Sequence, residues 1–524
     1  MLRRSHREKH ARNLGYLSPP AMVAAVADRR RAGDWRGVCA AGLVDVHVDP
    51  RDVAARFGAE QAAAIEADLL GFAPDLLRRF APRTASLELW PRARIVLSRL
   101  AGAIGDRAVL VADLPAGERF RQRIELRVLS AAKLDRPWYN LYDLPDWCWH
   151  ADAVAARRWA YGASATRLAW HDPDGRPYPP GVAVARRPAD RADEVEVLAE
   201  LLETGQVTAA YEAAGRAVDP KPPPRWYGGQ TLEPWLARFG ASLPVLAAES
   251  RRLAGRYARP SLRALSQSIA VDVADDGGLT VRMAAWERDF AGPIAFGVAA
   301  PVDVALLRRG ALRVDDLHPL VHEALFPGQP RTPPAPVPVE RPVIRIRCGG
   351  QWHPVRVTGA RITTLEHSER EIDREFTLAV LGGPIGGCAA AVRAFRTGAK
   401  PVPKDLRRIR QDLFALAFHG DTDTLLAIVA AGLDPGLRDS DGGTLMHWLH
   451  HLDHRRALPV LLAAGLAVTD HDRNGDTPLH RAAASGAADV VAALVEAGAD
   501  PGSVDGRGRT AAQVLAQARR GSKR

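Results

Sequence analysis

The sequence predicts a multi-domain protein with an α+β N-terminal region followed by a C-terminal α-helical solenoid. Three observations lead to this fold class. Thr444, Thr477 and Thr510 recur at one constant interval, and a fixed period of this length is typical of stacked helical repeats. The chain between 85 and 326 alternates strand-like apolar runs with helical patterns. Prolines crowd positions 327–342 and mark a boundary between the two parts.

The N-terminal segment, 1–84, combines a basic stretch with helical patterns. Residues 1–19 are rich in arginine and lack the apolar core of a signal peptide, so we expect a flexible basic arm. Over 20–84 the pattern is helical. Gly33 can end one helix and Asp34 can cap the next, while Asp49 precedes a proline in the position of a further cap. We therefore predict a helical segment here.

Residues 85–326 are predicted to form an α+β domain. Short apolar runs at 108–111 and 124–128 predict strands. The clearest hairpin joins 269–273 to 279–283, because apolar and polar residues alternate on both sides of an Asp-Gly turn. Helical patterns separate these runs, which favours mixed helices and antiparallel strands.

A proline-rich linker and a small unit are predicted next. The linker covers 327–342 and should be extended and semi-rigid. In the small unit, 343–402, two alternating runs around a Gly-Gly turn predict a β-hairpin, and Ser368 with Glu371 forms a capping box for a helix. The glycine-rich stretch 382–388 lacks the residues of a phosphate-binding loop, so we interpret it as a tight turn before a second helix.

The units of the 403–520 segment carry a recognisable motif. The central unit contains Asn-Gly-Asp-Thr-Pro-Leu-His-Arg-Ala-Ala-Ala-Ser-Gly at 474–486, and it resembles an ankyrin repeat. The preceding unit keeps Thr444 and His447 but has leucine in place of proline. The terminal units are atypical, as caps of a repeat array are. The resemblance covers about 411–520, and over its full length the chain resembles ankyrin-repeat-containing proteins of high-GC bacteria.

The ankyrin resemblance implies a function in protein binding. In that family, partners bind the concave face formed by the first helices and the hairpin fingers. Mapped in register, the expected partner-binding residues here are Ala415, Phe418, Trp448, His451, His471, Arg473 and Arg481. Trp448 is the residue least expected on an exposed helix face. It is either a binding anchor or an internal contact with the 343–402 unit.

Cysteine and histidine spacing points away from a metal site. Four cysteines are scattered along the chain: Cys39, Cys148, Cys348 and Cys388. They form no Cys-x-x-Cys pair, so we expect buried free thiols, no metal and no cofactor. His318 and His322 stand at i and i+4, as in a helical metal site, but the pattern lacks a third ligand. We interpret both as core or surface histidines.

Two further clusters have a structural interpretation. Four histidines could share one helix face: His447, His450, His451 and His454. Structural zinc sites usually gather their ligands from separate elements, and His447 corresponds to the structural histidine of the ankyrin motif. Five tryptophans between 138 and 170, interleaved with arginines, could stack bases. Because they show no periodicity, we expect a buried aromatic core instead.

Composition and charge narrow the function classes. The net charge is +10, but the excess is spread along the chain and the segment from Lys404 onward is neutral, so we expect no nucleic-acid partner. The absence of a long apolar run predicts no membrane span and a cytoplasmic protein. The leading prediction is an interaction or scaffold protein that binds a protein partner. Two alternatives stay open: an enzyme with its active site within 85–320 whose array recruits substrate, and a nucleic-acid-associated protein.

Overall fold

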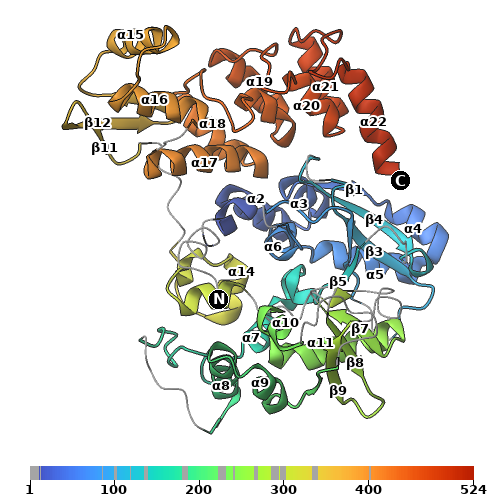
Figure 1. Cartoon of the computed structure of the whole chain (residues 1–524). Coiled ribbons are helices and arrows are strands. Elements are labelled where there is room, and N and C mark those ends of the chain that lie inside the picture. The colour runs from blue at the N-terminus through green and yellow to red at the C-terminus, as the bar shows by residue number, and fades with distance from the viewer. Residues whose placement is uncertain are drawn as a thin grey trace. The chain divides into compact units, whose positions relative to one another are not determined.

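The chain divides into two compact units in a computed structural model (Figure 1). Unit 1 is Met1–Pro115 with Arg123–Pro334, and unit 2 is Ala116–Gln122 with Ala335–Arg524. The structure describes residues 11, 13–84, 87–99, 103–117, 120–134, 140–179, 187–221, 232–239, 242–264, 269–284, 294–295, 302–332, 340–399 and 403–523. The predicted 20–84 domain and, apart from 116–122, the predicted 85–326 domain therefore belong to unit 1. The predicted 343–402 and 403–520 domains belong to unit 2.

Unit 1 is a mixed α/β structure, and its elements fall into two successive groups. The first group is α2 (Pro20–Arg31), α3 (Trp35–Ala41), β1 (Val44–His47), α4 (Pro50–Phe57), α5 (Ala59–Leu70), α6 (Pro74–Phe80), β2 (Ala93–Val96), β3 (Ala108–Asp113), β4 (Ile124–Ser130) and β5 (Asn140–Asp143). Four short helices flank β5 in the chain: η1 (Ala131–Lys133) precedes it, and η2 (Asp146–Cys148), η3 (Ala151–Ala156) and α7 (Arg157–Ala160) follow it. The second group is α8 (Arg191–Glu203), α9 (Val207–Ala213), β6 (Ala217–Asp219), α10 (Leu232–Phe239), α11 (Leu243–Tyr257), β7 (Ser261–Ala264), β8 (Ile269–Val273), β9 (Leu279–Met283) and β10 (Ile294–Ala295). It is followed by α13 (Val302–Arg308), η5 (Val314–Asp316) and α14 (Pro319–Leu325).

The strands of unit 1 form one sheet with a mirrored order. Among the described residues it is ten-stranded, in the order β1-β4-β3-β2-β5-β10-β7-β8-β9-β6. In the first half, β1 is parallel to β4, β2 to β4 form an antiparallel meander, and β5 is parallel to β2. The second half repeats every pairing with β6, β7 to β9 and β10. The halves meet where β5 pairs with β10 in parallel.

The two halves of unit 1 therefore share one topology: a helix pair, a strand, further helices, a meander and a central strand. The sequence carries a short trace of this repeat. Ala-Arg-Phe-Gly-Ala occurs at 55–59, where α4 ends and α5 begins. The same five residues occur at 237–241, and 237–239 are the last residues of α10. We interpret unit 1 as an internal duplication, which sequence patterns alone did not predict.

A buried carboxylate links the two halves. Asp143 ends β5 and is fully buried. It accepts hydrogen bonds from Arg252 (2.9 Å), from Arg256 (2.7 Å) and from the hydroxyl of Tyr257 (2.8 Å), all on α11. Burial raises the pKa of Asp143, but the two guanidinium groups outweigh this effect and the net pKa is lowered. The carboxylate therefore stays charged and paired across the junction.

Two sequence predictions for unit 1 need correction. Residues 13–17 are helical, and Leu14 and Leu17 are buried in the core, so this part of the 1–19 segment is no flexible arm. Residues 1–10 and 12 lie outside the described residues. The 20–84 segment contains strand β1, which pairs with β4 and so joins the sheet. Leu14, Leu17 and Val44 belong to one core cluster with apolar residues of β2, β3 and β4, a partnership that local patterns do not reveal.

The predicted hairpin of unit 1 is confirmed, and the predicted buried aromatic core is confirmed only in part. Strands β8 and β9 pair antiparallel from Ile269 with Met283 to Val273 with Leu279, as the Asp-Gly turn predicts. Of the tryptophan group, Trp147 and Trp149 are buried in the core, whereas Trp159 is 42% exposed. Trp138 lies outside the described residues. No helix in the described part of the chain is both long and apolar enough to cross a membrane.

Unit 2 begins with a small sheet-and-helix part, which we call the platform (residues 340–399). Its elements are β11 (Ile344–Cys348), β12 (Gln351–Thr358), β13 (Arg361–Thr364), α15 (Glu369–Val380) and α16 (Gly387–Thr397). The three strands form an antiparallel sheet within these described residues. The predicted capping box is confirmed, because Ser368 and Glu371 exchange hydrogen bonds at the start of α15. Residues 333–339 of the predicted proline-rich linker lie outside the described residues.

The rest of unit 2 is a stack of helix pairs, which we call the repeat array (residues 404–523). Its elements are α17 (Lys404–His419), α18 (Thr422–Ala431), η6 (Leu445–His451), α19 (His454–Ala463), α20 (Pro478–Ala484), α21 (Ala488–Glu496) and α22 (Ala511–Lys523). Gly420 and Gly486 turn between their helices with φ of 79° and 74°. Asp453 occupies the same position with φ −69°, at the start of α19 but without a side-chain cap hydrogen bond. The helix before it, η6, is a 3₁₀-helix. This repeat therefore departs from its neighbours, as its sequence predicts.

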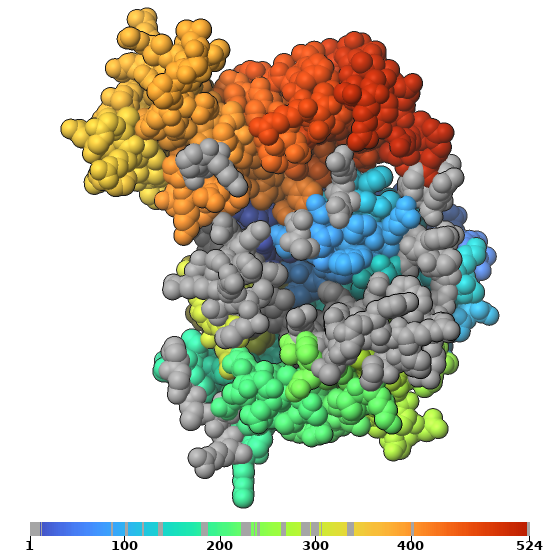
Figure 2. Space-filling model, viewed as in Figure 1, coloured from blue at the N-terminus to red at the C-terminus, as the bar shows by residue number. Residues whose placement is uncertain are grey.

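The segments that join successive helix pairs, 432–444, 464–477 and 497–510, are the three fingers of the array. The platform contacts the first finger through backbone and side-chain groups. Ala360 donates its N–H to the carbonyl of Gly432 (2.7 Å) and accepts from the N–H of Asp434 (3.3 Å). The Arg361 guanidinium donates to the Leu433 carbonyl (3.1 Å). Arg396 on α16 forms an ion pair with Asp434 (2.6 Å). The platform and the array accordingly form one continuous surface, coloured yellow to red in Figure 2.

Candidate functional site

Each finger of the array is held by a buried aspartate. Asp439, Asp472 and Asp505 recur at the same interval as the threonines and are all buried. Each carboxylate accepts the backbone N–H groups at the second and fourth positions after it, at 2.7 to 3.0 Å. An aspartate that binds its own following backbone closes a tight turn. The repeated spacing therefore sets the shape of all three fingers.

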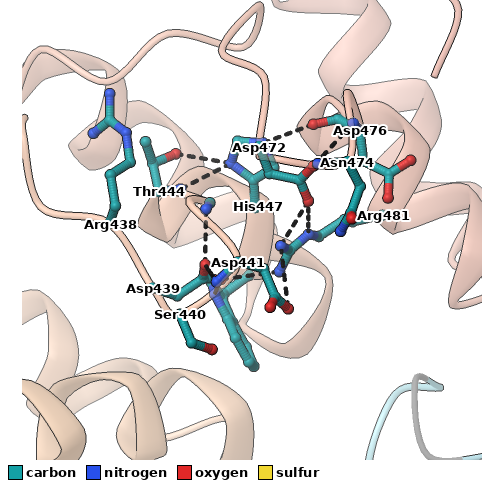
Figure 3. A network of polar contacts seen from close by, with 12 residues as sticks. Arg438, Asp439, Ser440, Asp441, Thr444, His447, Asp472, Asn474, Asp476 and Arg481 are labelled. Atoms are coloured by element: carbon teal, nitrogen blue, oxygen red, sulfur yellow. Dashed lines mark hydrogen bonds and ion pairs between the residues drawn. The ribbon is translucent and has the colours of Figure 1, made fainter. Parts of the chain in front are cut away.

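Arg481 on α20 connects two successive fingers (Figure 3). Its guanidinium lies 3.0 Å from the Asp439 carboxylate and 2.7 Å from that of Asp472. Burial lowers the pKa of Arg481, but the two carboxylates outweigh burial and the net pKa is raised. Arg481 was expected to contact a partner. That role stays a prediction, and the structure adds a structural role as a brace between fingers.

An aromatic cluster lies beside this brace. It consists of Phe414 and Phe418 on α17 and Trp448 and His451 on η6. Trp448 stacks on His451 with ring centroids 5.7 Å apart, and its ring lies 6.0 Å from Phe414 and 6.1 Å from Phe418. The four side chains are half-buried. The guanidinium carbon of Arg481 lies 5.9 Å from the Trp448 ring, so the cluster continues into the brace.

The position of Trp448 bears on its two predicted roles. Its indole N–H donates to the Asp439 carboxylate (2.8 Å), and its ring contacts come from the array. The platform forms hydrogen bonds with other residues of the array, at 432–434 and at Arg438, whose N–H donates to the Arg396 carbonyl (2.7 Å). These contacts favour a place in the array's own first-helix face over a contact with the 343–402 unit.

Some of the expected partner-binding residues contact one another in the structure, and others do not. Phe418, Trp448 and His451 share ring contacts, and Arg481 joins them. Ala415 is half-buried on α17. His471 and Arg473 are exposed at the second finger, where Arg473 donates to the Ser440 carbonyl (2.9 Å). Sequence reasoning missed Phe414 as a cluster member and also missed the aspartates, although their constant interval was a usable signal.

His447 is a structural histidine, as predicted. Its Nδ1 accepts the N–H of Thr444 (3.0 Å), and its Nε2 donates to the carbonyl of Asp476 (3.1 Å). His480 repeats both contacts with Thr477 and Arg509. Because both ring nitrogens are used, His447 has no position left for a metal ion. His318 is structural as well: it caps α14 and contacts Asp75 at 2.8 Å.

The buried state of His447 makes the array sensitive to acid. Burial, reinforced by the nearby charge of Arg481, lowers the pKa of His447 to about 4. An unfolded histidine titrates near about 6.5, so the unfolded chain binds the proton first and stability falls as pH drops through this window. We expect a loss of about 2 kcal/mol between pH 7 and pH 5 from this residue.

The measurement is urea unfolding of the full chain at several pH values. His447→Gln should lower stability at pH 7 but flatten the dependence between pH 7 and 5. His471→Gln, at an exposed position, should keep the wild-type slope. An unchanged slope in His447→Gln would contradict the assignment.

Unit 1 contains a polar cavity, the kind of feature that an active site within 85–320 would require. Its volume is about 330 Å³, and it is lined by Ser98, Arg99, Leu144, Pro145, Asp146, Trp147, Trp149, Glu249, Arg252 and Arg256. Arg252 lies 2.8 Å from Glu249 and 2.9 Å from Asp143, which also pairs with Arg256. Burial raises the pKa of Glu249, and Arg252 opposes that effect. These charges neutralise one another, an arrangement that stabilises the junction of the halves.

Comparison with known proteins gives a result for the array. No curated protein matches the chain. A family model described as ankyrin repeats (3 copies) matches residues 413–505, which run from α17 to the third finger. The match agrees with the helix pairs, the fingers and the paired Thr–His contacts described above. Residues 413–505 of this protein are an ankyrin-repeat region.

Proposed function

We propose that this protein is a cytoplasmic interaction or scaffold protein that binds a protein partner through the concave face of its ankyrin repeats. Ankyrin repeats are in general protein-interaction modules. The observation that carries the proposal is the half-buried aromatic cluster of Phe414, Phe418, Trp448 and His451, beside Arg481. Aromatic and arginine side chains are the residues most enriched in binding hot spots.

The order already present in the cluster supports this role. The Trp448 ring is held by the Asp439 carboxylate and by the ring of His451. A side chain that is ordered before binding loses little conformational entropy when a partner arrives. The array carries no net charge over 404–524, so the expected partner surface is an apolar or aromatic segment of a protein.

Partner capture with matched tryptophan variants tests the proposal. Full-length wild type, Trp448→Ala and Trp352→Ala are used as baits, and the captured proteins are identified. Trp352 is 60% exposed on the platform and controls for the loss of any surface tryptophan. We expect Trp448→Ala to lose the main captured protein and Trp352→Ala to keep it.

Stability must be measured on the same variants, because Trp448 also packs within the array. Losing its ring contacts should cost about 1 to 2 kcal/mol, so capture is performed well below both melting temperatures. Phe418→Ala provides a second test at a neighbouring position. Equal capture by wild type, Trp448→Ala and Phe418→Ala would show that this face is not the binding site.

A further inference from the structure

Four potential metal ligands from distant sequence positions meet in the platform. Cys348 ends β11, His353 lies on β12, His367 follows β13, and Cys388 lies in the first turn of α16. Among the described residues, their ligand atoms all lie within 4.8 Å of one another. His353 Nδ1 is 2.8 Å from His367 Nε2, which is 3.5 Å from Cys348 Sγ.

We propose that these four side chains bind a structural zinc ion. Zinc binds thiolate sulfur at about 2.3 Å and imidazole nitrogen at about 2.0 to 2.1 Å in a tetrahedron. Ligand atoms on such a tetrahedron are separated by roughly 3.2 to 3.8 Å. The observed separations lie around this range, so small side-chain rotations are sufficient to enclose the ion.

The ligand set selects the metal and its role. Two thiolates and two neutral imidazoles balance the charge of Zn²⁺, and binding releases the two thiol protons to solvent. Sulfur and imidazole donors favour zinc over Mg²⁺ or Ca²⁺, which prefer oxygen. Four protein ligands from separate elements fill the tetrahedron and leave no position for a reacting water. The site is therefore structural and not catalytic.

Surrounding groups orient the histidine ligands. His353 Nε2 lies 3.4 Å from the Glu366 carboxylate, which leaves its Nδ1 turned toward His367. A carboxylate on the far nitrogen of a ligating histidine is a common feature of zinc sites. The loop that carries His367 is fixed by Thr364, whose hydroxyl donates to the His367 carbonyl (2.9 Å), and by the cap of α15 that begins at Ser368.

Backbone glycines make the close approach possible. Gly349 and Gly350, with φ of 57° and 86°, form the turn that returns the chain from Cys348 to His353. Gly387 has φ 50°, and a Cβ there would lie 2.3 Å from the Cys348 sulfur. Only glycine therefore lets the start of α16 reach the hairpin.

The proposed ion would fasten the sheet of the platform to α16. The same helix carries Arg396, which pairs with Asp434 of the first finger. A sheet of short strands buries little apolar surface, and small domains of this kind often depend on a metal ion. Zinc would thus stabilise the surface on which the ankyrin array is stacked.

Metal analysis of the untagged full chain tests the site. We expect about one zinc ion per chain after purification with reductant and without chelator. Replacing zinc with Co²⁺ should give the visible absorption of a tetrahedral ion together with thiolate-to-cobalt charge transfer. This spectrum reports the ligand set in the wild-type protein, so it does not depend on any variant that fails to fold.

Variants then assign the ligands. Cys388→Ser and His367→Asn should lose most of the bound zinc, while Cys39→Ser, which replaces a buried cysteine of unit 1, should retain it. Chelator should lower the melting temperature of the wild type and leave that of Cys388→Ser unchanged. Wild-type protein that binds no zinc when it is supplied, a Cys348–Cys388 disulfide in the purified chain, or full zinc in both ligand variants would overturn the proposal.

Discussion

Gly359→Ala is expected to destabilise unit 2 by about 3 kcal/mol and to lower its melting temperature by roughly 6 to 12 °C. Gly359 has φ 58°, and a Cβ there would lie 2.3 Å from the Ile428 carbonyl oxygen and 2.5 Å from that of Gly432. Both neighbours are backbone atoms of the array and can move only if the platform separates from the first finger. Thermal unfolding of the full chain, followed by circular dichroism, measures the loss.

Gly508→Ala is the matched control for this prediction. Gly508 also has a left-handed backbone, with φ 74°, but a Cβ there would meet nothing within 4 Å. Its substitution carries the conformational strain, about 1 to 2 kcal/mol, without the clash. Equal destabilisation by the two variants would mean that the docking contact contributes nothing.

The same docking predicts that the array depends on the platform. Repeat arrays share their stability between neighbouring units, and a short array buries a thin core. A fragment that begins at Pro403, directly before α17, should therefore melt well below one that begins at Val343, which retains the platform. Equal melting temperatures would contradict this dependence.

Asp472→Ala is expected to cost about 3 to 5 kcal/mol. The Asp472 carboxylate accepts two backbone N–H groups of its finger and pairs with Arg481. Burial raises the pKa of Asp472, but the contacts with Arg481 outweigh it and the net pKa is lowered. Its removal leaves a half-buried guanidinium short of one partner and opens the turn. Chemical denaturation at pH 7 measures the effect.

Asp470→Ala tests whether the cost is specific to the buried position. Asp470 lies in the same finger, but its side chain is 30% exposed and its only ion pair, among the described contacts, is 3.5 Å from Arg438. Surface pairs of this kind contribute at most about 1 kcal/mol. Similar costs for the two aspartates would refute the role of the brace.

Predictions from local pattern were reliable where the stabilising contacts are themselves local. The β8–β9 hairpin follows from an Asp-Gly turn between alternating runs, and the start of α15 follows from a capping box within one helical turn. The ankyrin region follows from the constant interval between its motif residues, because each repeat stacks on a copy of itself.

The repeated topology of unit 1 was not predictable in this way. Its two halves pair their strands identically, yet little more than Ala-Arg-Phe-Gly-Ala at 55–59 and 237–241 marks the repeat in the sequence. The pairing of strands depends on which positions are apolar and not on which apolar amino acid occupies them. The same topology can therefore persist when the amino acids at equivalent positions differ. The halves also differ in the spacing of their elements, which hides a fixed period.

The same distinction between local and long-range contacts applies to the candidate sites. The sequence by itself determined the ankyrin motif, its first-helix face and the unusual position of Trp448, because register along a repeat places those residues. Only the tertiary structure decided that Arg481 braces Asp439 to Asp472, and that Cys348, His353, His367 and Cys388 converge. Those contacts join residues whose separations follow no helical or strand period. They exist because strands and helices that are far apart in the chain bury their apolar faces together, and that packing brings the polar side chains within reach of one another.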